Sequence, residues 1–370
     1  MSKDLNKNLS DLIQQQNKLI EQQNKLLEQL VAGRKNPTEE LLLPGEKIFV
    51  ENLFRDEIRS GFFVTAQRKR LWNIQLNLIA ELDRICQKHD IRYFAFFGTL
   101  LGAARHKGFV PWDDDVDVVM LRPDYEKFKA IIKNEISEPY FVDSWHDYKI
   151  EGEEPEANQD KSFRQFVKRD QREQHPLWWP FWPMIKLKDS RTTFAQYLDR
   201  PHVHQGIFID VFPFDPVPPF SNNQQKFNYK LEQEILIAIA LPDKIKEAAQ
   251  ANKKLLIKKT QLEQFLQFPH KRKALELEAF ALKNFSQSEF VGQLRDHCLL
   301  NQKISYSADN FKEVVYLPFE KIKIPCPAGY KDCLTTYYGD WHKLVYTHNH
   351  SQIYSADFSY KEFFNSIKFV

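Results

Sequence analysis

The residues best suited to chemistry lie in one segment, FGTLLGAARHKGFVPWDDDVDVVM (97–120), which holds four aspartates within five positions. Where the chain is extended, alternate side chains point the same way, so Asp113, Asp115 and Asp117 are expected on one side. Asp114 would point to the other. Neighbouring carboxylates repel one another unless a cation lies between them, and Mg²⁺ or Mn²⁺ prefers such oxygen ligands. Carboxylates at this spacing can therefore hold a metal ion that assists in-line phosphoryl displacement. The alternative is a solvated acidic turn, which the apolar residues flanking Asp117 disfavour.

A Gly-Thr pair precedes these aspartates, between an expected strand and an expected helix. The amides of Gly98 and Thr99 and the positive end of the helix would attract phosphate, and glycine lets the backbone approach it closely. An ordinary N-cap threonine would give the same pattern, so the pair gains meaning only from the acidic strand that follows. Three cationic or potentially cationic residues lie between the two features and could add phosphate contacts: Arg105, His106 and Lys107.

A third carboxylate is expected from a neighbouring strand. Asp210 interrupts the apolar run GIFIDVFPFD (206–215), where a charge without a partner would be costly. Asp215 is the alternative, and its other interpretation is a turn residue after Pro213. A Gly-Thr turn, a D-x-D strand and a third carboxylate together indicate a nucleotidyltransferase-type site, with metal ligands Asp115, Asp117 and Asp210.

The elements that must position these residues follow from periodicity and residue type. Alternation of helix and strand predicts a mixed α/β (α+β) core with a large helical portion. We expect helices over 65–88, 99–106, 123–135 and 330–338, strands over 91–97, 115–120, 183–187, 206–212 and 314–317, and a mostly helical stretch over 222–300.

Composition limits the class of protein. The chain has 370 residues, of which 42% are apolar and 14% aromatic, enough for a packed core. A net charge of +2 gives no indication of a nucleic-acid partner. The chain lacks an apolar leader and a 20-residue apolar run, so we expect a cytoplasmic protein without a membrane span. The four cysteines form no CxxC pair, so we expect reduced, mostly buried thiols: Cys86, Cys298, Cys326 and Cys333.

The N-terminal segment repeats with a heptad period, since QQNKLIE (15–21) is followed by QQNKLLE (22–28). Its leucine stripe needs a partner helix, which would come from a second copy in a coiled-coil homo-oligomer or from the body of the protein. The predicted organisation is a heptad helix (1–36), a linker (37–65), a catalytic domain (66–345) and a C-terminal tail packed on that domain (346–370).

Several stretches closely resemble the LicD family of phosphocholine-type transferases, whose relatives include the fukutin group. They cover roughly residues 70–345 in order and are ELDRICQKHDIRYF (81–94), GTLLGAARHKGFVPWDDDVDVVMLRPDYEKF (98–128), IKLKDSRTT (185–193), FIDVFPFD (208–215) and YLPFEKIKIPCPAGYKDCLTTYYGDW (316–341). The resemblance implies a nucleotidyltransferase-like fold and metal-dependent transfer of a phospho-alcohol to a hydroxyl of a cell-surface or capsular glycan. The donor is commonly CDP-choline, and CMP is released.

Carried over by position, the family pattern makes Asp115 and Asp117 metal ligands supported by Asp113. It also matches Asp210 to the acidic position of the second motif, and Gly98 with Thr99 to the nucleotide phosphates. This chain has Phe97 where many members have a small residue, which would narrow the donor pocket.

Other activities stay open at this stage. CDP-linked ribitol, glycerol or ethanolamine could replace CDP-choline. A metal-dependent D-x-D glycosyltransferase is a second possibility, although the Gly-Thr turn argues against it. A catalytically silent assembly module is a third, and the intact aspartates argue against it.

Two further stretches could serve the substrates. Trp178, Trp179 and Trp182 could bind a quaternary ammonium group through their faces, stack on acceptor sugars, or simply fill a core loop. The stretch KIKEAAQANKKLLIKK (244–259) could contact an anionic membrane that carries a lipid-linked acceptor, at the inner face, or could be a solvated helix face.

Overall fold

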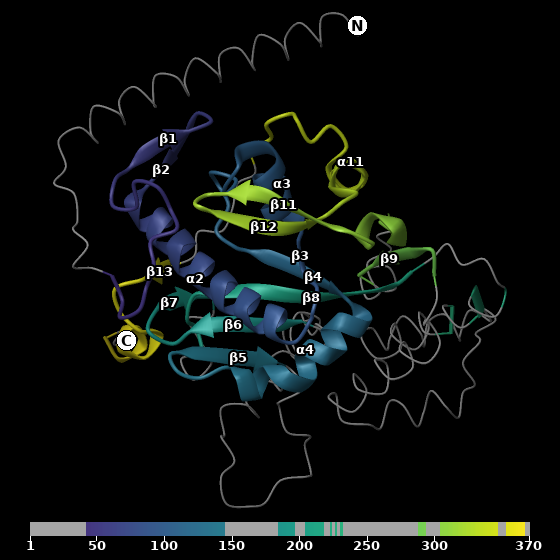
Figure 1. The fold of residues 1–370 in the computed structure, drawn as a ribbon. Coiled ribbons are helices and arrows are strands. Elements are labelled where there is room, and N and C mark those ends of the chain that lie inside the picture. The colour runs from purple at the N-terminus through teal and green to yellow at the C-terminus, as the bar shows by residue number, and fades with distance from the viewer. Residues whose placement is uncertain are drawn as a thin grey trace, which may run out of the picture.

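The computed structural model describes residues 42–144, 184–196, 204–217, 288–293, 304–346 and 353–366, with a few single positions between 223 and 231. Some predicted features lie outside these residues and stay predictions: the heptad segment 1–36, the cluster Trp178, Trp179 and Trp182, the stretch 244–259 and most of the helical stretch 222–300. The described residues form a mixed sheet with helices packed on it (Figure 1). The predicted mixed α/β fold is therefore confirmed.

A seven-stranded sheet forms the centre of the fold, and β8 (Phe208–Pro216) is its longest strand. One edge of β8 pairs in parallel with β4 (Asp117–Leu121), which also pairs with β3 (Phe94–Ala95). The other edge of β8 pairs antiparallel with β6 (Ile185–Asp189) and, farther along, with β9 (Phe290–Gly292). The outer strands are β5 (Tyr140–Ser144) beside β6 and β10 (Tyr306–Ser307) beside β9. Aromatic and β-branched residues fill β8, and nearly all of them are buried, as expected for a central strand.

Two helices, α2 (Ala66–Lys88) and α4 (Arg122–Glu135), cross one face of this sheet (Figure 1). Helix α2 begins at the N-cap Thr65, whose side chain accepts a hydrogen bond from the amide of Arg68. Its apolar stripe, including Trp72, Leu76 and Leu82, is fully buried. The predicted helices 65–88 and 123–135 are therefore confirmed to within a residue.

The third helix of the core, α3 (Phe97–His106), starts two residues before the predicted position. Phe97 lies in the left-handed region with φ 45°, an unusual conformation for an aromatic residue. Its ring packs among aromatic neighbours, with centroids 5.1 Å from Phe96 and 6.1 Å from Phe212. Tertiary packing, which the local pattern does not reveal, therefore holds the turn into α3.

The described part of the predicted linker (37–65) packs onto the body of the protein. Residues 42–65 include the hairpin β1 (Glu57–Arg59) and β2 (Phe62–Val64), and Val50 and Leu53 are buried in the main core. The backbone of this segment is held by α2, where Asn73 accepts a hydrogen bond of 2.8 Å from the amide of Phe49. The segment therefore folds onto the body, which its weak periodicity did not predict.

The C-terminal half completes the body. The hairpin β11 (Val314–Phe319) and β12 (Ile322–Pro327) follows the short 3-10 helix η3 (Ala308–Phe311) and leads into α11 (Tyr330–Tyr338). Farther on, β13 (Ile353–Ser355) pairs with β7 (Thr193–Ala195) and is followed by α12 (Tyr360–Ser366). The predicted helix 330–338 is confirmed. The predicted strands all exist with shifted ends, and the strand expected over 91–97 shortens to two residues.

The described cysteines Cys86, Cys326 and Cys333 are buried free thiols, as predicted, and Cys298 lies outside the described residues. Burial raises the pKa of Cys326 and of Cys333 to about 12, so both stay protonated at neutral pH. In the part of the chain that the structure describes, no helix is both long and apolar enough to span a bilayer.

Candidate active site

A row of three charged residues crosses the centre of the sheet. Asp117 of β4 is the register partner of Asp210 of β8, and Lys186 of β6 is the register partner of Asp210 on its other side. Side chains of directly paired residues lie on the same face of a sheet. The Nζ atom of Lys186 is 2.7 Å from Oδ1 of Asp210, and these side chains are only 9% and 11% exposed. The sheet therefore brings together two carboxylates and one ammonium group from three strands.

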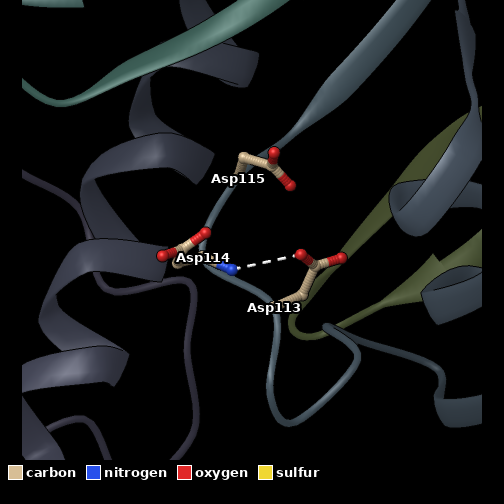
Figure 2. A group of neighbouring side chains, drawn as sticks. All are labelled: Asp113, Asp114 and Asp115. Carbon is tan, nitrogen blue, oxygen red and sulfur yellow. Dashed lines mark hydrogen bonds between the residues drawn. The ribbon is translucent and has the colours of Figure 1, made fainter. Parts of the chain in front are cut away.

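The loop that leads into β4 adds the remaining aspartates. One carboxylate oxygen of each of Asp113, Asp114 and Asp115 lies within 4.8 Å of the others. Figure 2 shows the carboxylates of Asp113 and Asp115 on one side of the chain, with Asp114 turned away from them. The predicted alternation is thus seen here, although regular β-structure begins only at Asp117.

Side chains of helix α2 donate hydrogen bonds to the backbone carbonyls of this loop and so hold it in place. The carbonyl of Asp113 accepts hydrogen bonds from Arg68 Nη1 at 2.9 Å and from Trp72 Nε1 at 3.0 Å. The carbonyl of Asp114 accepts one from Gln75 Nε2 at 2.8 Å. These hydrogen bonds from a buried helix therefore hold the loop that carries the aspartates.

The Gly-Thr pair at the start of α3 positions the same aspartates. A Cβ atom on Gly98 would lie 2.2 Å from Oδ2 of Asp113, so glycine is the residue that lets this carboxylate lie against the helix start. Oγ1 of Thr99 accepts a hydrogen bond of 2.9 Å from the amide of Asp117, and Thr99 is buried. The pair therefore orients the acidic residues, a role that its sequence pattern did not indicate. Its predicted contact with phosphate remains a prediction.

The carboxylates of these aspartates repel one another. Burial raises the pKa of Asp117 well above its ordinary value, and the charges of Asp115 and Asp210 raise it further. Burial and the charge of Asp115 likewise raise the pKa of Asp113. Burial also raises the pKa of Asp210, against the opposing effect of Lys186. One ammonium group does not neutralise this many carboxylates.

These residues fit a hard divalent cation. Their donor atoms are carboxylate oxygens, the ligands preferred by Mg²⁺ and Mn²⁺, and they come from a loop and two strands that hold them in place. A bound cation would offset the repulsion that raises the pKa values of Asp113 and Asp117. The predicted ligand set Asp115, Asp117 and Asp210 is therefore chemically suited to the expected metal.

Other predicted residues lie elsewhere. Arg105, His106 and Lys107 occupy the last turn and the C-cap of α3, about 10 to 14 Å along the helix axis from Gly98 at 1.5 Å per residue. Arg105 Nη1 donates hydrogen bonds of 3.0 Å to the carbonyls of Trp341 and Lys343. Burial and the charge of Arg105 lower the pKa of His106 to about 4, so that imidazole is neutral at neutral pH. The helix thus separates this basic run from the Gly-Thr pair, and its expected contact with phosphate stays a prediction.

Asp215, the alternative third carboxylate, already has a cationic partner. Its oxygens accept hydrogen bonds from Arg122, at 2.6 Å from Nε and 2.8 Å from Nη2. It stands five residues beyond Asp210 on β8, so it belongs to a different part of the strand.

Lys186 is the site residue that the sequence analysis missed. The signal for it is the run IKLKD (185–189), where a lysine alternates with apolar residues in a strand whose every residue is buried. A lysine in such a strand needs a partner, as an aspartate does. That the partner is Asp210 depends on the order of strands in the sheet, which the local pattern does not give.

Comparison with known proteins agrees with this geometry. Residues 90–218 match the family described as LicD/FKTN/FKRP, nucleotidyltransferase domain. The lipopolysaccharide cholinephosphotransferase LicD of Haemophilus influenzae is 28% identical over 270 residues, which cover 73% of this chain and 89% of that protein. An uncharacterised protein of Rickettsia typhi is 38% identical over 55 residues, covering 15% of this chain and 18% of its own length. The matched range 90–218 contains all the aspartates of the site, together with Lys186.

Proposed function

We propose that the chain transfers phosphocholine from CDP-choline to a hydroxyl group of a cell-surface glycan and releases CMP, because residues 90–218 match the nucleotidyltransferase domain of the LicD/FKTN/FKRP family. The relative from Haemophilus influenzae is named as a lipopolysaccharide cholinephosphotransferase, which supports lipopolysaccharide or a related glycan as acceptor. The observation that carries the proposal is the row Lys186, Asp210 and Asp117, with Asp113 and Asp115 beside it.

The acidic residues would bind the metal ion, and Lys186 would position Asp210 through its ion pair. Asp115, Asp117 and Asp210 are the proposed ligands, with Asp113 as their support. A bound Mg²⁺ or Mn²⁺ would neutralise the diphosphate of the donor and the charge that develops on the leaving phosphate. Asp210 is the proposed ligand rather than Asp215, because it is the direct register partner of Asp117, whereas Asp215 stands five residues farther along β8.

The transfer itself is an in-line displacement at the phosphorus atom next to choline. The acceptor hydroxyl forms the new P–O bond, the bond to the CMP oxygen breaks, and the hydroxyl proton passes to a carboxylate of the cluster. Lys186 opposes the rise in pKa that burial gives Asp210, which favours the ionised carboxylate that a metal ligand needs. Positioning of the donor by a rigid loop and helix start supplies the remaining advantage.

One assay tests the activity. The purified protein is incubated with Mg²⁺ or Mn²⁺ and with CDP-choline, CDP-ethanolamine, CDP-glycerol or CDP-ribitol, with and without a glycan acceptor, and CMP is measured. We expect acceptor-dependent CMP release that is fastest with CDP-choline and is lost in Asp117→Asn. Asp309→Asn is the matched control, because Asp309 is a surface aspartate whose side chain is 74% exposed.

Each other outcome has a definite meaning. Preference for another CDP-alcohol would change the substrate and keep the reaction. Release of a nucleoside diphosphate from a sugar nucleotide would replace the proposal with a D-x-D glycosyltransferase. Failure with every donor, in protein that folds and binds Mg²⁺, would contradict the proposal.

Two segments outside the described residues have proposed roles in assembly and membrane binding. We propose that the heptad helix (1–36) makes the enzyme a homo-oligomer and that the lysine-rich stretch (244–259) brings it to the inner face of the membrane, where a lipid-linked acceptor would be presented. Deletion of 1–36 tests the first by its effect on oligomeric mass. Binding to anionic vesicles tests the second.

A further inference from the structure

Two partly exposed tyrosines stand at the end of α11, beside the start of α3. Tyr337 and Tyr338 are 42% and 38% exposed, and their rings meet edge to face with centroids 4.7 Å apart. We call them the tyrosine pair. The ring of Tyr337 also packs edge to face on Phe97, with centroids 5.3 Å apart. The pair therefore offers partly exposed aromatic faces beside the start of α3.

The tyrosine pair adjoins the acidic residues. The pKa of Tyr338 is raised by burial, by Tyr337, and then by the negative charges of Asp113, Asp117 and Asp115. Helix α11 packs against α3, and the ring of Tyr337 rests on Phe97 at the start of α3, so packing also places the pair beside the acidic residues. Phe97, which supports the pair, directly precedes Gly98, whose Cα lies against the carboxylate of Asp113.

The position of the pair is fixed. Gly339 ends α11 in the left-handed region with φ 66°, and its amide donates a hydrogen bond to the carbonyl of Thr335. Just beyond, Arg105 of α3 holds the carbonyls of Trp341 and Lys343. Arg105 is thus a positioning residue that ties the end of α11 to the helix beside the acidic residues.

We propose that the tyrosine pair binds the trimethylammonium group of the donor and selects choline over ethanolamine. This inference rests on the proposed function, because it names the part of the donor that the pair would recognise. A trimethylammonium group has no N–H, so it cannot donate hydrogen bonds to the neighbouring carboxylates. Aromatic faces in an acidic environment attract it by cation–π interaction. The ammonium group of ethanolamine is strongly hydrated and can hydrogen-bond to carboxylates, so it gains less from the rings.

The test compares two donors in four variants. In Tyr338→Leu we expect kcat/KM for CDP-choline to fall about 3- to 30-fold, the range that loss of one cation–π contact gives, while kcat/KM for CDP-ethanolamine changes less than about 2-fold. Tyr337→Leu should act in the same direction. Tyr338→Phe keeps the ring and should keep the preference for choline. Tyr316→Leu is the control, since Tyr316 is a surface tyrosine of β11 that is 57% exposed.

An equal loss for both donors would overturn the inference, because the ring would then contact the cytidine or the acceptor. No loss in Tyr338→Leu would overturn it as well. Circular dichroism melting of each variant shows whether it is folded.

A binding measurement separates this inference from the proposed function. Calorimetric titration with phosphocholine and with phosphoethanolamine, in the presence of Mg²⁺, should show tighter binding of phosphocholine that Tyr338→Leu reduces. If no donor is turned over but this preference exists, the proposed function fails and the inference stands. If CDP-choline is turned over but the preference is absent or unaffected by Tyr338→Leu, the function stands and the inference fails.

Discussion

Asp117 and Asp210 are direct partners in the register of the parallel strands β4 and β8. Their side chains therefore project from the same face at neighbouring positions, although 93 residues separate them in the chain. A slip of one residue in this register would turn one carboxylate to the opposite face. The register is secured beside the site, since the amide of Asp210 donates to the carbonyl of Val116 at 2.9 Å.

Replacing Asp117 by asparagine should abolish activity and stabilise the metal-free protein at neutral pH. The pKa of Asp117 is raised in the folded state, so folding favours the protonated form of this side chain. The stability that this gives is fully present below the ordinary aspartate pKa of 3.8 and is lost as the pH rises through the raised pKa. Asparagine removes that loss.

Thermal unfolding in EDTA between pH 5 and pH 8 measures this effect. The melting temperature of Asp117→Asn should exceed that of the unmodified protein by a margin that grows with pH. Mg²⁺ should raise the melting temperature of the unmodified protein more than that of the variant. A variant that is less stable than the unmodified protein in EDTA at pH 8 would contradict the electrostatic argument.

Replacing Lys186 by methionine should destabilise the metal-free protein by about 3 kcal/mol or more, because Asp210 would be left as a buried charge without its ammonium partner. The double variant Lys186→Met, Asp210→Asn should recover much of this loss. Chemical denaturation of the two single variants and the double variant forms a double-mutant cycle. Additive effects, with no recovery in the double variant, would show that the pair does not act as a unit.

Replacing Thr99 by valine should cost about 1–3 kcal/mol of stability, since the amide of Asp117 would lose the acceptor that Oγ1 supplies. Serine keeps that oxygen and should preserve both stability and activity. Because the hydrogen bond orients Asp117, kcat should fall more in the valine variant than the loss of folded protein explains. Equal behaviour of the serine and valine variants, measured by CMP release and by urea unfolding, would rule out this positioning role.

The local parts of the site were predictable from the sequence. The D-x-D spacing and the apolar residues around Asp117 are read within a few positions, and the helical period gave the bounds of α2 and α4 almost to the residue. The parts that were missed depend on packing between distant segments. Lys186 joins the site only because β6 pairs with β8, and the start of α3 depends on the rings around Phe97.

Helix α3 separates the basic run from the Gly-Thr pair in space. Arg105, His106 and Lys107 are close in sequence to both the Gly-Thr pair and the aspartates. The intervening residues form α3, which carries the run away from Gly98, and the chain then returns to the aspartates at its N-terminal end. A segment that folds back on itself in this way does not keep its sequence order in space.

The two aspartates of β8 should differ in what they contribute. Asp215 accepts two hydrogen bonds from Arg122, whose side chain is 9% exposed, so Asp215→Asn should destabilise the fold by about 3 kcal/mol. It should leave the dependence of CMP release on Mg²⁺ concentration unchanged in the folded fraction. Asp210→Asn should do the opposite: it should raise the Mg²⁺ concentration needed for half-maximal rate, or abolish the reaction, in protein that stays folded. If Asp215→Asn shifts the Mg²⁺ dependence and Asp210→Asn does not, the third carboxylate of the site is Asp215.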